Sequence, residues 1–187
     1  MDESSLLLRQ IPHSIEAEQS VLGAMLIDAR CIPDVVEALT GEDFYLKANR
    51  EIYETIYTMF NFSATIDPVT VLDQMKLTGV YDENTSRSYL LQLMEITPTA
   101  ANVKEYIRIV KDKALLRRIA ETAGELTTLV QEGGETAQAV LDLAEQRVYA
   151  IRQGRSAQGL EPLSKILVDV FDQLQELSMS GSEVPGM

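Results

Sequence analysis

The chain has 187 residues, a formal net charge of −13 and an apolar content of 45%. This length and composition allow one domain of ordinary size plus an appendage, with enough apolar side chains for a core. They exclude a membrane span, because the uncharged apolar stretches fall short of the roughly 18 to 20 residues that a bilayer crossing requires. The acidic start MDESSLLLRQ lacks a signal-peptide pattern, so we expect a cytoplasmic protein.

Helix signals follow one another through the first hundred residues. Ser14 is placed as the cap of a helix over 15–28, and Pro33 fits the first turn of a short helix over 33–39. Residues 41–45, GEDFY, form a predicted turn whose two aromatic side chains enter the core. Further helices are expected at 48–60, 68–78 and 86–96. For the second of these, Asp67 is the expected cap and Gly79 the left-handed residue that ends it.

A helical hairpin is predicted over 100–153. One long helix continues to Gly133 and Gly134, and a second helix follows from about residue 135. The first helix carries two apolar lines, which require two neighbours, and its small residues permit close approach of another helix. One line is predicted to self-associate, through Tyr106, Ile109, Leu116, Ala120, Ala123 and Val130. Packing of three helices within one chain is the alternative.

A separate linker is predicted over 154–187, with an amphipathic helix at about 162–178. Its apolar residues recur three or four apart and form one stripe. The stripe consists of Leu163, Ile166, Leu167, Val170, Phe171, Leu174 and Leu177. It can dock on another polypeptide or fold back on its own head domain. No period-two alternation is found, so the expected fold is all-α: a helical head over 1–99, the hairpin and the linker.

Charge is unevenly distributed along the chain. Residues 1–103 contain six Lys or Arg and sixteen Asp or Glu, whereas residues 104–118 contain six basic and two acidic residues. One short basic segment is insufficient to neutralise several phosphates at once, which favours a protein partner over unaided DNA binding. Lys104, Arg108 and Lys111 share a helix face, with Arg118 further along. This face is either solvated or a docking surface for an acidic partner.

The sequence lacks the common catalytic and phosphate-binding motifs of enzymes. Phosphate-binding glycine loops, a GxSxG elbow, HExxH and paired CxxC motifs are absent. With Cys31 as the single cysteine and His13 as the single histidine, neither an internal disulfide nor a Cys/His metal cluster can form. The carboxylate pairs at 51/54 and 121/125 are interpreted as solvated helix faces, and a helical enzyme with a carboxylate metal site is the least favoured hypothesis. We predict no catalytic, metal or cofactor-binding residue in this chain.

Six blocks together resemble the N-terminal region of the DnaB-type replicative DNA helicases. They are PHSIEAEQSVLGAML (12–26), EDFY (42–45), NREIYETI (49–56), IDPVTV (66–71), SYLLQLMEITPTAANVKEY (88–106) and LLRRIAETAGEL (115–126). The segments AEQSVLGA and TPTAAN are the most specific. Asn49 is a departure, because the family often has His at that position.

The resemblance implies the N-terminal collar and linker of a hexameric helicase that unwinds duplex DNA at the bacterial replication fork. Its RecA-like motor domain, with the sites for ATP, Mg²⁺ and single-stranded DNA, is expected to follow the linker, so this chain alone should be inactive. Dimers joined by the hairpins would build the hexamer in the nucleoid-associated cytoplasm. The linker helix would dock on the adjacent motor domain. Primase is the expected partner, with a helicase loader as a further one, and Lys104, Arg108 and Lys111 are candidates for docking. The alternative is a stand-alone all-α adaptor or regulator.

Overall fold

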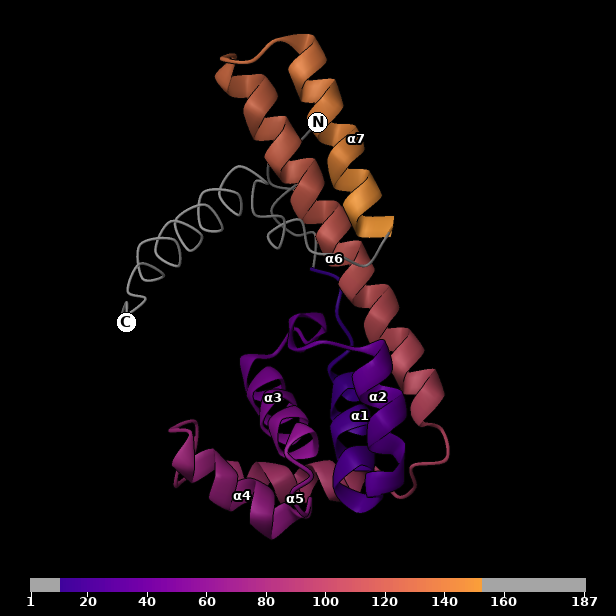
Figure 1. Ribbon diagram of the computed structural model, residues 1–187, viewed down its shortest axis with the longest axis vertical. Helices are drawn as coiled ribbons and strands as arrows, with labels where there is room; N and C mark the ends of the chain where they lie inside the picture. Colours follow the sequence, from indigo (N-terminus) through magenta and orange to yellow (C-terminus); the bar gives the residue numbers. More distant parts are fainter. Residues whose placement is uncertain (1–10, 153–187) are drawn as a thin grey trace, which may run out of the picture. The chain divides into compact units, whose positions relative to one another are not determined.

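The computed structural model describes residues 11–152, which form helices joined by turns and short loops (Figure 1). The elements in chain order are α1 (Ile15–Ile27), η2 (Ala29–Cys31), α2 (Ile32–Ala38), η3 (Gly41–Asp43), α3 (Lys47–Asn61), α4 (Pro68–Leu77), α5 (Ser86–Ile96), α6 (Val103–Glu132) and α7 (Ala137–Arg152). The elements η2 and η3 are single 3-10 turns. No strand occurs within 11–152, which confirms the predicted all-α class.

Local capping chemistry sets the ends of several helices as predicted. The Ser14 side chain accepts a hydrogen bond from the backbone N–H of Ala17, at 3.3 Å, and opens α1. Asp67 caps α4, where Pro68 occupies the first turn, and Gly79 follows the helix with φ +76°. A positive φ suits glycine because it has no Cβ to clash. These signals depend only on neighbouring residues, so the sequence alone reveals them.

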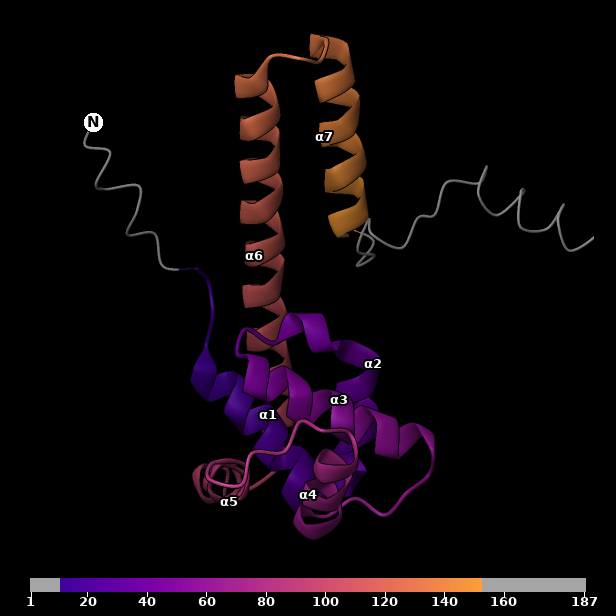
Figure 2. The same cartoon turned by 90° about the vertical axis from the view of Figure 1, so that its left-hand side faces the viewer.

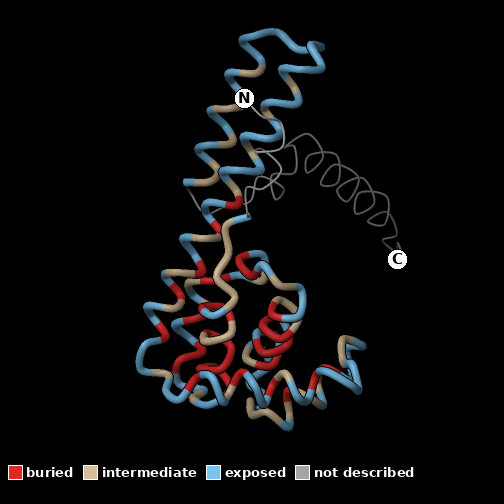
Figure 3. The backbone as a smooth tube through the Cα atoms, turned by 180° about the vertical axis from the view of Figure 1, so that it is seen from behind, coloured by how far each residue is buried: buried red, intermediate tan, exposed pale blue. Residues whose placement is uncertain are grey.

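The described residues divide into two compact units after Ala123, within α6. Val103, Ile107 and Val110, in the first turns of α6, are buried in the hydrophobic core of the first unit. The compact head therefore reaches beyond residue 99, where the predicted division lay. The second unit contains the end of α6 together with α7, and its residues are exposed or half-buried (Figure 3).

The head core lies among α1, α2, α3, α4, α5 and the start of α6. α5 runs across α1, while α4 lies beside α3 and α5 (Figures 1 and 2). The largest fully buried apolar side chains are Phe44, Leu22, Met25, Ile32, Leu39, Ile56, Leu90, Leu93, Val21, Val35 and Val71. The predicted aromatic pair separates: Phe44 is buried, but Tyr45 is 39% exposed. The prediction for Tyr45 was wrong because its ring stacks on His13, with centroids 4.5 Å apart, at the surface.

Close contact of α1 with α5 depends on one glycine. A Cβ at Gly23 would lie 2.3 Å from the Leu93 carbonyl oxygen and 2.3 Å from Oγ1 of Thr97. No side chain fits in that space without moving backbone. Gly23 therefore sets the distance between the two helices and, with it, the position of the other α5 side chains.

Candidate assembly and docking surfaces

The residues predicted for hairpin self-association fall into two groups. Tyr106 and Ile109 are half-buried and pack against the head core. The other four side chains are exposed: Leu116, Ala120, Ala123 and Val130. Beyond Arg117, no residue of α6 is buried. The apolar line thus begins against the head and continues into solvent along the same helix.

α7 has no buried residue over its entire length. Leu141 and Val148, seven positions apart and therefore on the same side of the helix, are 52% and 53% exposed. Within the second unit, the Arg147 guanidinium lies 3.4 Å from the Glu125 carboxylate and joins the two helices of the hairpin. This hairpin therefore presents apolar side chains that its own residues leave uncovered.

The three basic candidates lie in a mixed-charge setting. The Lys104 ammonium is 3.3 Å from the Asp34 carboxylate, and Arg108 pairs with both Glu105 and Asp112. The hydrogen bond from Arg108 lowers the pKa of the Glu105 carboxyl group, and the reciprocal bond raises the pKa of the guanidinium. Lys111 is exposed as well. Their assignment to partner docking stays a prediction, as does that of the seven linker residues, which lie outside the described residues.

A buried polar network, which the sequence did not reveal, holds the head together. Glu18 is 1% exposed, and its carboxylate accepts N–H groups from Tyr45 (2.7 Å), Leu46 (3.3 Å) and the Asn49 side chain (2.9 Å). These backbone N–H groups are in the two residues just before α3, and the carboxylate therefore lies near the positive dipole end of that helix. Glu18 thus orders the approach to α3, although it belongs to α1.

Asn49 extends this network to α5. Its side-chain oxygen accepts the Tyr89 hydroxyl at 2.6 Å, and the Tyr89 oxygen accepts the Gln19 amide at 3.2 Å. Burial raises the pKa of Tyr89, so the phenol stays protonated and can donate. The only signal of this role in the sequence was Asn49 itself, at a position where the family often has His.

Two consecutive arginines fasten α6 to the loops of the head. Arg117 is 8% exposed. Its guanidinium donates to the Pro12 carbonyl oxygen at 2.9 Å and to the Asp43 carbonyl oxygen at 2.5 Å. Desolvation lowers the pKa of its guanidinium. Arg118 pairs with the carboxylate of the buried Asp43. Arg118 is therefore a structural ion-pair partner and does not extend the basic face.

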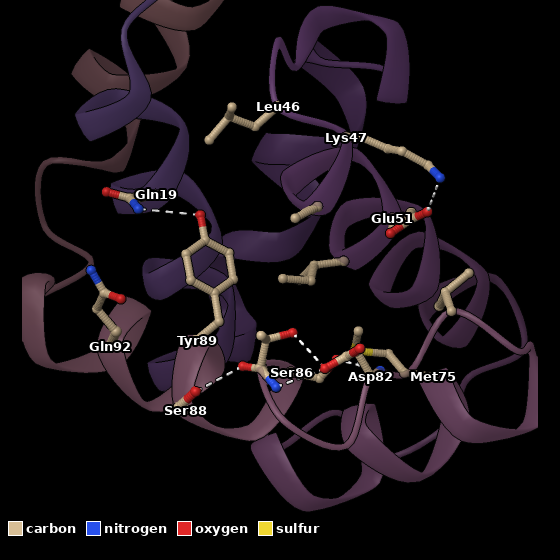
Figure 4. A pocket seen from close by; sticks show the side chains of 14 residues that line it. Gln19, Leu46, Lys47, Glu51, Met75, Asp82, Ser86, Ser88, Tyr89 and Gln92 are labelled. Carbon is tan, nitrogen blue, oxygen red and sulfur yellow. Dashed lines mark hydrogen bonds and ion pairs between the residues drawn. The ribbon is translucent and has the colours of Figure 1, made fainter.

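A pocket of about 630 Å³ lies between α1, α3, the α4–α5 loop and α5 (Figure 4). Ile52 and Met75 contribute apolar lining, while Gln19 and Tyr89 meet on one side, and the Lys47–Glu51 ion pair (3.4 Å) lies on another. Dashed lines join several of the polar groups drawn there, whereas none reaches Gln92. The pocket can accept an apolar side chain, but its lining contains no His or Cys that could act as a base or nucleophile.

Burial of Cys31 disfavours the reactive thiolate form of its side chain. Burial is the main cause that raises the pKa of the Cys31 thiol to about 11, so little thiolate is present at neutral pH. No group of three or more His, Cys, Asp or Glu that could hold a metal ion occurs within 11–152. In the same range, none of the helices combines the length and apolar character needed to cross a bilayer.

The fold and surfaces define an all-α domain with a head held by buried polar contacts and a hairpin whose apolar side chains are exposed. Residues 10–112 match the family model described as DnaB-like helicase N terminal domain. The chain belongs to this family.

Full-length relatives and solved structures agree with that membership. The chain is 33% identical over 179 residues to the replicative DNA helicase DnaB of Geobacillus stearothermophilus and 34% identical over 175 residues to that of Mycobacterium leprae. These matches cover 94% and 92% of this chain but only 39% and 29% of the relatives.

Among solved structures, the N-terminal domain of DnaB helicase from Mycobacterium tuberculosis matches with TM-score 0.71 at 36% identity, covering 75% of this chain and 99% of that one. The corresponding Helicobacter pylori domain, which is described together with its interactions with primase, matches with TM-score 0.55 at 19% identity. That match covers 70% of this chain and 99% of that one, and it supports the fold alone.

Proposed function

We propose that this chain is the N-terminal collar and linker region of a hexameric replicative DNA helicase of the bacterial cytoplasm and nucleoid, and that it mediates assembly and docking. Family membership and the replicative helicases among the relatives support this proposal. ATP hydrolysis, Mg²⁺ and single-stranded DNA binding belong to a motor domain. This chain by itself is then inactive as a helicase.

The observation that carries the assembly role is the uncovered apolar line on the hairpin. A helix of 16 residues with no buried position gains little stability from its own chain, because most helical stability in proteins comes from packing an amphipathic face. A second copy of the hairpin supplies the missing cover. The small side chains Ala120 and Ala123 favour close approach of that copy.

The assembly role is tested with the double variant Leu141→Asp/Val148→Asp. Each native side chain is about half exposed, so burying the remainder in a dimer stabilises it by about 1 kcal/mol per residue, and a buried carboxylate would cost several times more. Light scattering after size-exclusion chromatography should show a dimer or larger species for the native chain and a monomer for the variant. Gln146→Asp, which adds a carboxylate at an exposed polar position of α7, is the control for added negative charge on this helix and should still associate. A native chain that is monomeric at high micromolar concentration contradicts the proposal.

Docking of primase, with a helicase loader as a further partner, is the second part of the proposal. The solved domain from Helicobacter pylori motivates it, since that structure is described with its primase interactions. Lys104, Arg108 and Lys111 contribute to the surface in this scheme. Lys111→Glu should weaken primase binding in calorimetry by about two- to fivefold, the scale of one exposed ion pair. Arg30→Glu, which is also an exposed cation, should leave binding unchanged.

For the linker, we propose that its seven apolar residues dock on the motor domain of the adjacent subunit. Val170→Asp/Leu174→Asp in the full-length protein should then abolish ring assembly while the circular dichroism of the head stays native. Unfolding of the head would instead indicate that the stripe folds back on its own chain.

A further inference from the structure

A second groove in the head, of about 740 Å³, lies between the α3–α4 loop, α4 and α5. Its lining includes the core side chains Met59 and Leu90 and the half-buried Leu72. Val69 on α4 and Leu91 on α5 also line it, and they are 76% and 51% exposed. The groove thus has an apolar floor and an apolar rim.

Hydrogen bonds hold both ends of α4, which forms one wall of this groove. The Asp67 carboxylate accepts the backbone N–H groups of Val69 (2.8 Å) and Thr70 (3.0 Å), and the Thr70 hydroxyl accepts the Asp67 N–H at 3.0 Å. This reciprocal pair fixes the first turn of α4. At the other end of α4, the N–H groups of Val80 and Tyr81 both donate to the Met75 carbonyl oxygen at 3.1 Å. A preformed groove loses little conformational entropy on binding a ligand.

Two cations line the groove in a chain that is strongly acidic. Lys76 and Arg87 face a single carboxylate among the lining residues, that of Asp73. Within the described residues, neither cation lies within the 4.0 Å ion-pair distance of a carboxylate. Arg30 and Lys47 of the same unit are paired, whereas Arg50, Lys111 and Lys113 are also without an ion pair there. The Lys76 ammonium instead lies 5.1 Å from the centroid of the Tyr81 ring.

Helix stability does not account for both cations. Lys76 is in the last turn of α4, where a positive charge is favourable. Arg87 is the second residue of α5, where the helix dipole disfavours a positive charge. Arg87 therefore places an unneutralised cation beside exposed apolar side chains, at a small cost to its own helix.

From this combination we infer that the groove binds an acidic amphipathic segment of a partner protein. Apolar side chains of the segment cover Val69, Leu72 and Leu91, and its carboxylates pair with Lys76 and Arg87. A pocket-filling small molecule would leave the rim in water, since Val69 projects mostly into solvent. The two cations repel a basic segment. A nucleic acid phosphate backbone lacks the apolar groups that the floor of the groove requires. This role is independent of the hairpin and goes beyond the proposed assembly function.

The test uses the whole chain and a phage-displayed library of random 12-residue peptides. Sequences that combine Asp or Glu with large apolar residues should be enriched. Their affinity should fall about tenfold on Lys76→Glu/Arg87→Glu, on the scale of two lost ion pairs with added repulsion, and should be unchanged on the control Arg30→Glu. Versions of the peptides with Lys in place of the acidic residues should regain binding to the Lys76→Glu/Arg87→Glu chain. Val69→Asp, a mostly exposed position, should also abolish binding without unfolding the head.

Four results would overturn the inference. Enriched peptides without acidic residues, or equal binding to Lys76→Glu/Arg87→Glu, would show that the cations play no part. Failure to enrich any peptide, together with a changed association state of Lys76→Glu/Arg87→Glu in light scattering, would assign the groove to a second copy or to residues 161–179 of the chain. Failure to enrich with no such change would show that the groove binds no peptide. Loss of hairpin association in Leu141→Asp/Val148→Asp leaves the peptide result unaffected, so the two proposals fail separately.

Discussion

Replacing Glu18 by glutamine should destabilise the head substantially, although the two side chains have the same shape. The Glu18 carboxylate accepts three hydrogen bonds at 2.7, 3.3 and 2.9 Å in a site where it is 1% exposed. Hydrogen bonds to charged groups contribute about 1.5–3 kcal/mol each. Glutamine retains one oxygen and turns an NH₂ group toward N–H donors, so at least one bond is lost and one donor is left unsatisfied. We expect a loss of about 2–4 kcal/mol in the free energy of unfolding.

Urea unfolding followed by far-UV circular dichroism measures this loss, since the chain contains no tryptophan for fluorescence. In a thermal melt followed by the same signal, a domain of this size loses about 4 °C of melting temperature per kcal/mol, so the melting temperature should fall by about 8–16 °C. Glu16→Gln removes the same charge from an exposed position two residues earlier and should change the free energy by less than about 0.5 kcal/mol. Equal, small effects of the two substitutions would refute the view that Glu18 organises the start of α3.

Three further predictions follow from single positions. Gly23→Ala should destabilise the head by about 1–3 kcal/mol in urea unfolding, because the new methyl group meets the Leu93 carbonyl oxygen. Gly124 has open space around it, so Gly124→Ala should stabilise its helix by about 0.5–1 kcal/mol. Similar effects of the two substitutions would contradict the packing argument. The Cys31 thiol, with its pKa near 11, should react with a disulfide reagent at pH 8 roughly a hundredfold more slowly in the native chain than in urea. Side-chain and backbone hydrogen bonds lower the pKa of Asp82 below its ordinary 3.8, so its stabilising contribution is complete above that pH and is lost as the pH falls through the lower native value. The difference in unfolding free energy between the native chain and Asp82→Ala should therefore shrink below pH 3.8, and a difference that persists at lower pH would contradict this.

Features set by neighbouring residues were predictable from the sequence. The caps at Ser14 and Asp67 and the left-handed Gly79 each depend on contacts within about four residues, and all three are confirmed. The 3.6-residue periodicity likewise located the helices, because burial on one side requires it. The all-α class followed from these local signals together.

Contacts between distant parts of the chain were not predictable. Glu18 bonds Asn49 across 31 positions and Tyr89 bonds Asn49 across 40, and neither pair has a local signature. Periodicity indicates that Glu18 lies near the start of its own helix, but it does not indicate that the start of α3 lies against the Glu18 carboxylate. Adjacent residues such as Phe44 and Tyr45 also look equivalent in sequence, although only one of them enters the core.

The apolar line of α6 shows what periodicity cannot predict. The apolar repeat continues along the helix, whereas its burial by the head ends partway. A helix of 30 residues is about 45 Å long, and its buried positions end at Arg117, near its middle. Sequence alone therefore cannot say where the head ceases to cover the line. Leu116 and Ile119, each 47% exposed, lie at this transition. Since scattered apolar residues are common on surfaces, these two alone would mean little. An apolar repeat that persists along one helix and reappears on the next at Leu141 and Val148 lowers the solubility of an isolated monomer, and this is the reason for our proposal that another copy of the chain covers it.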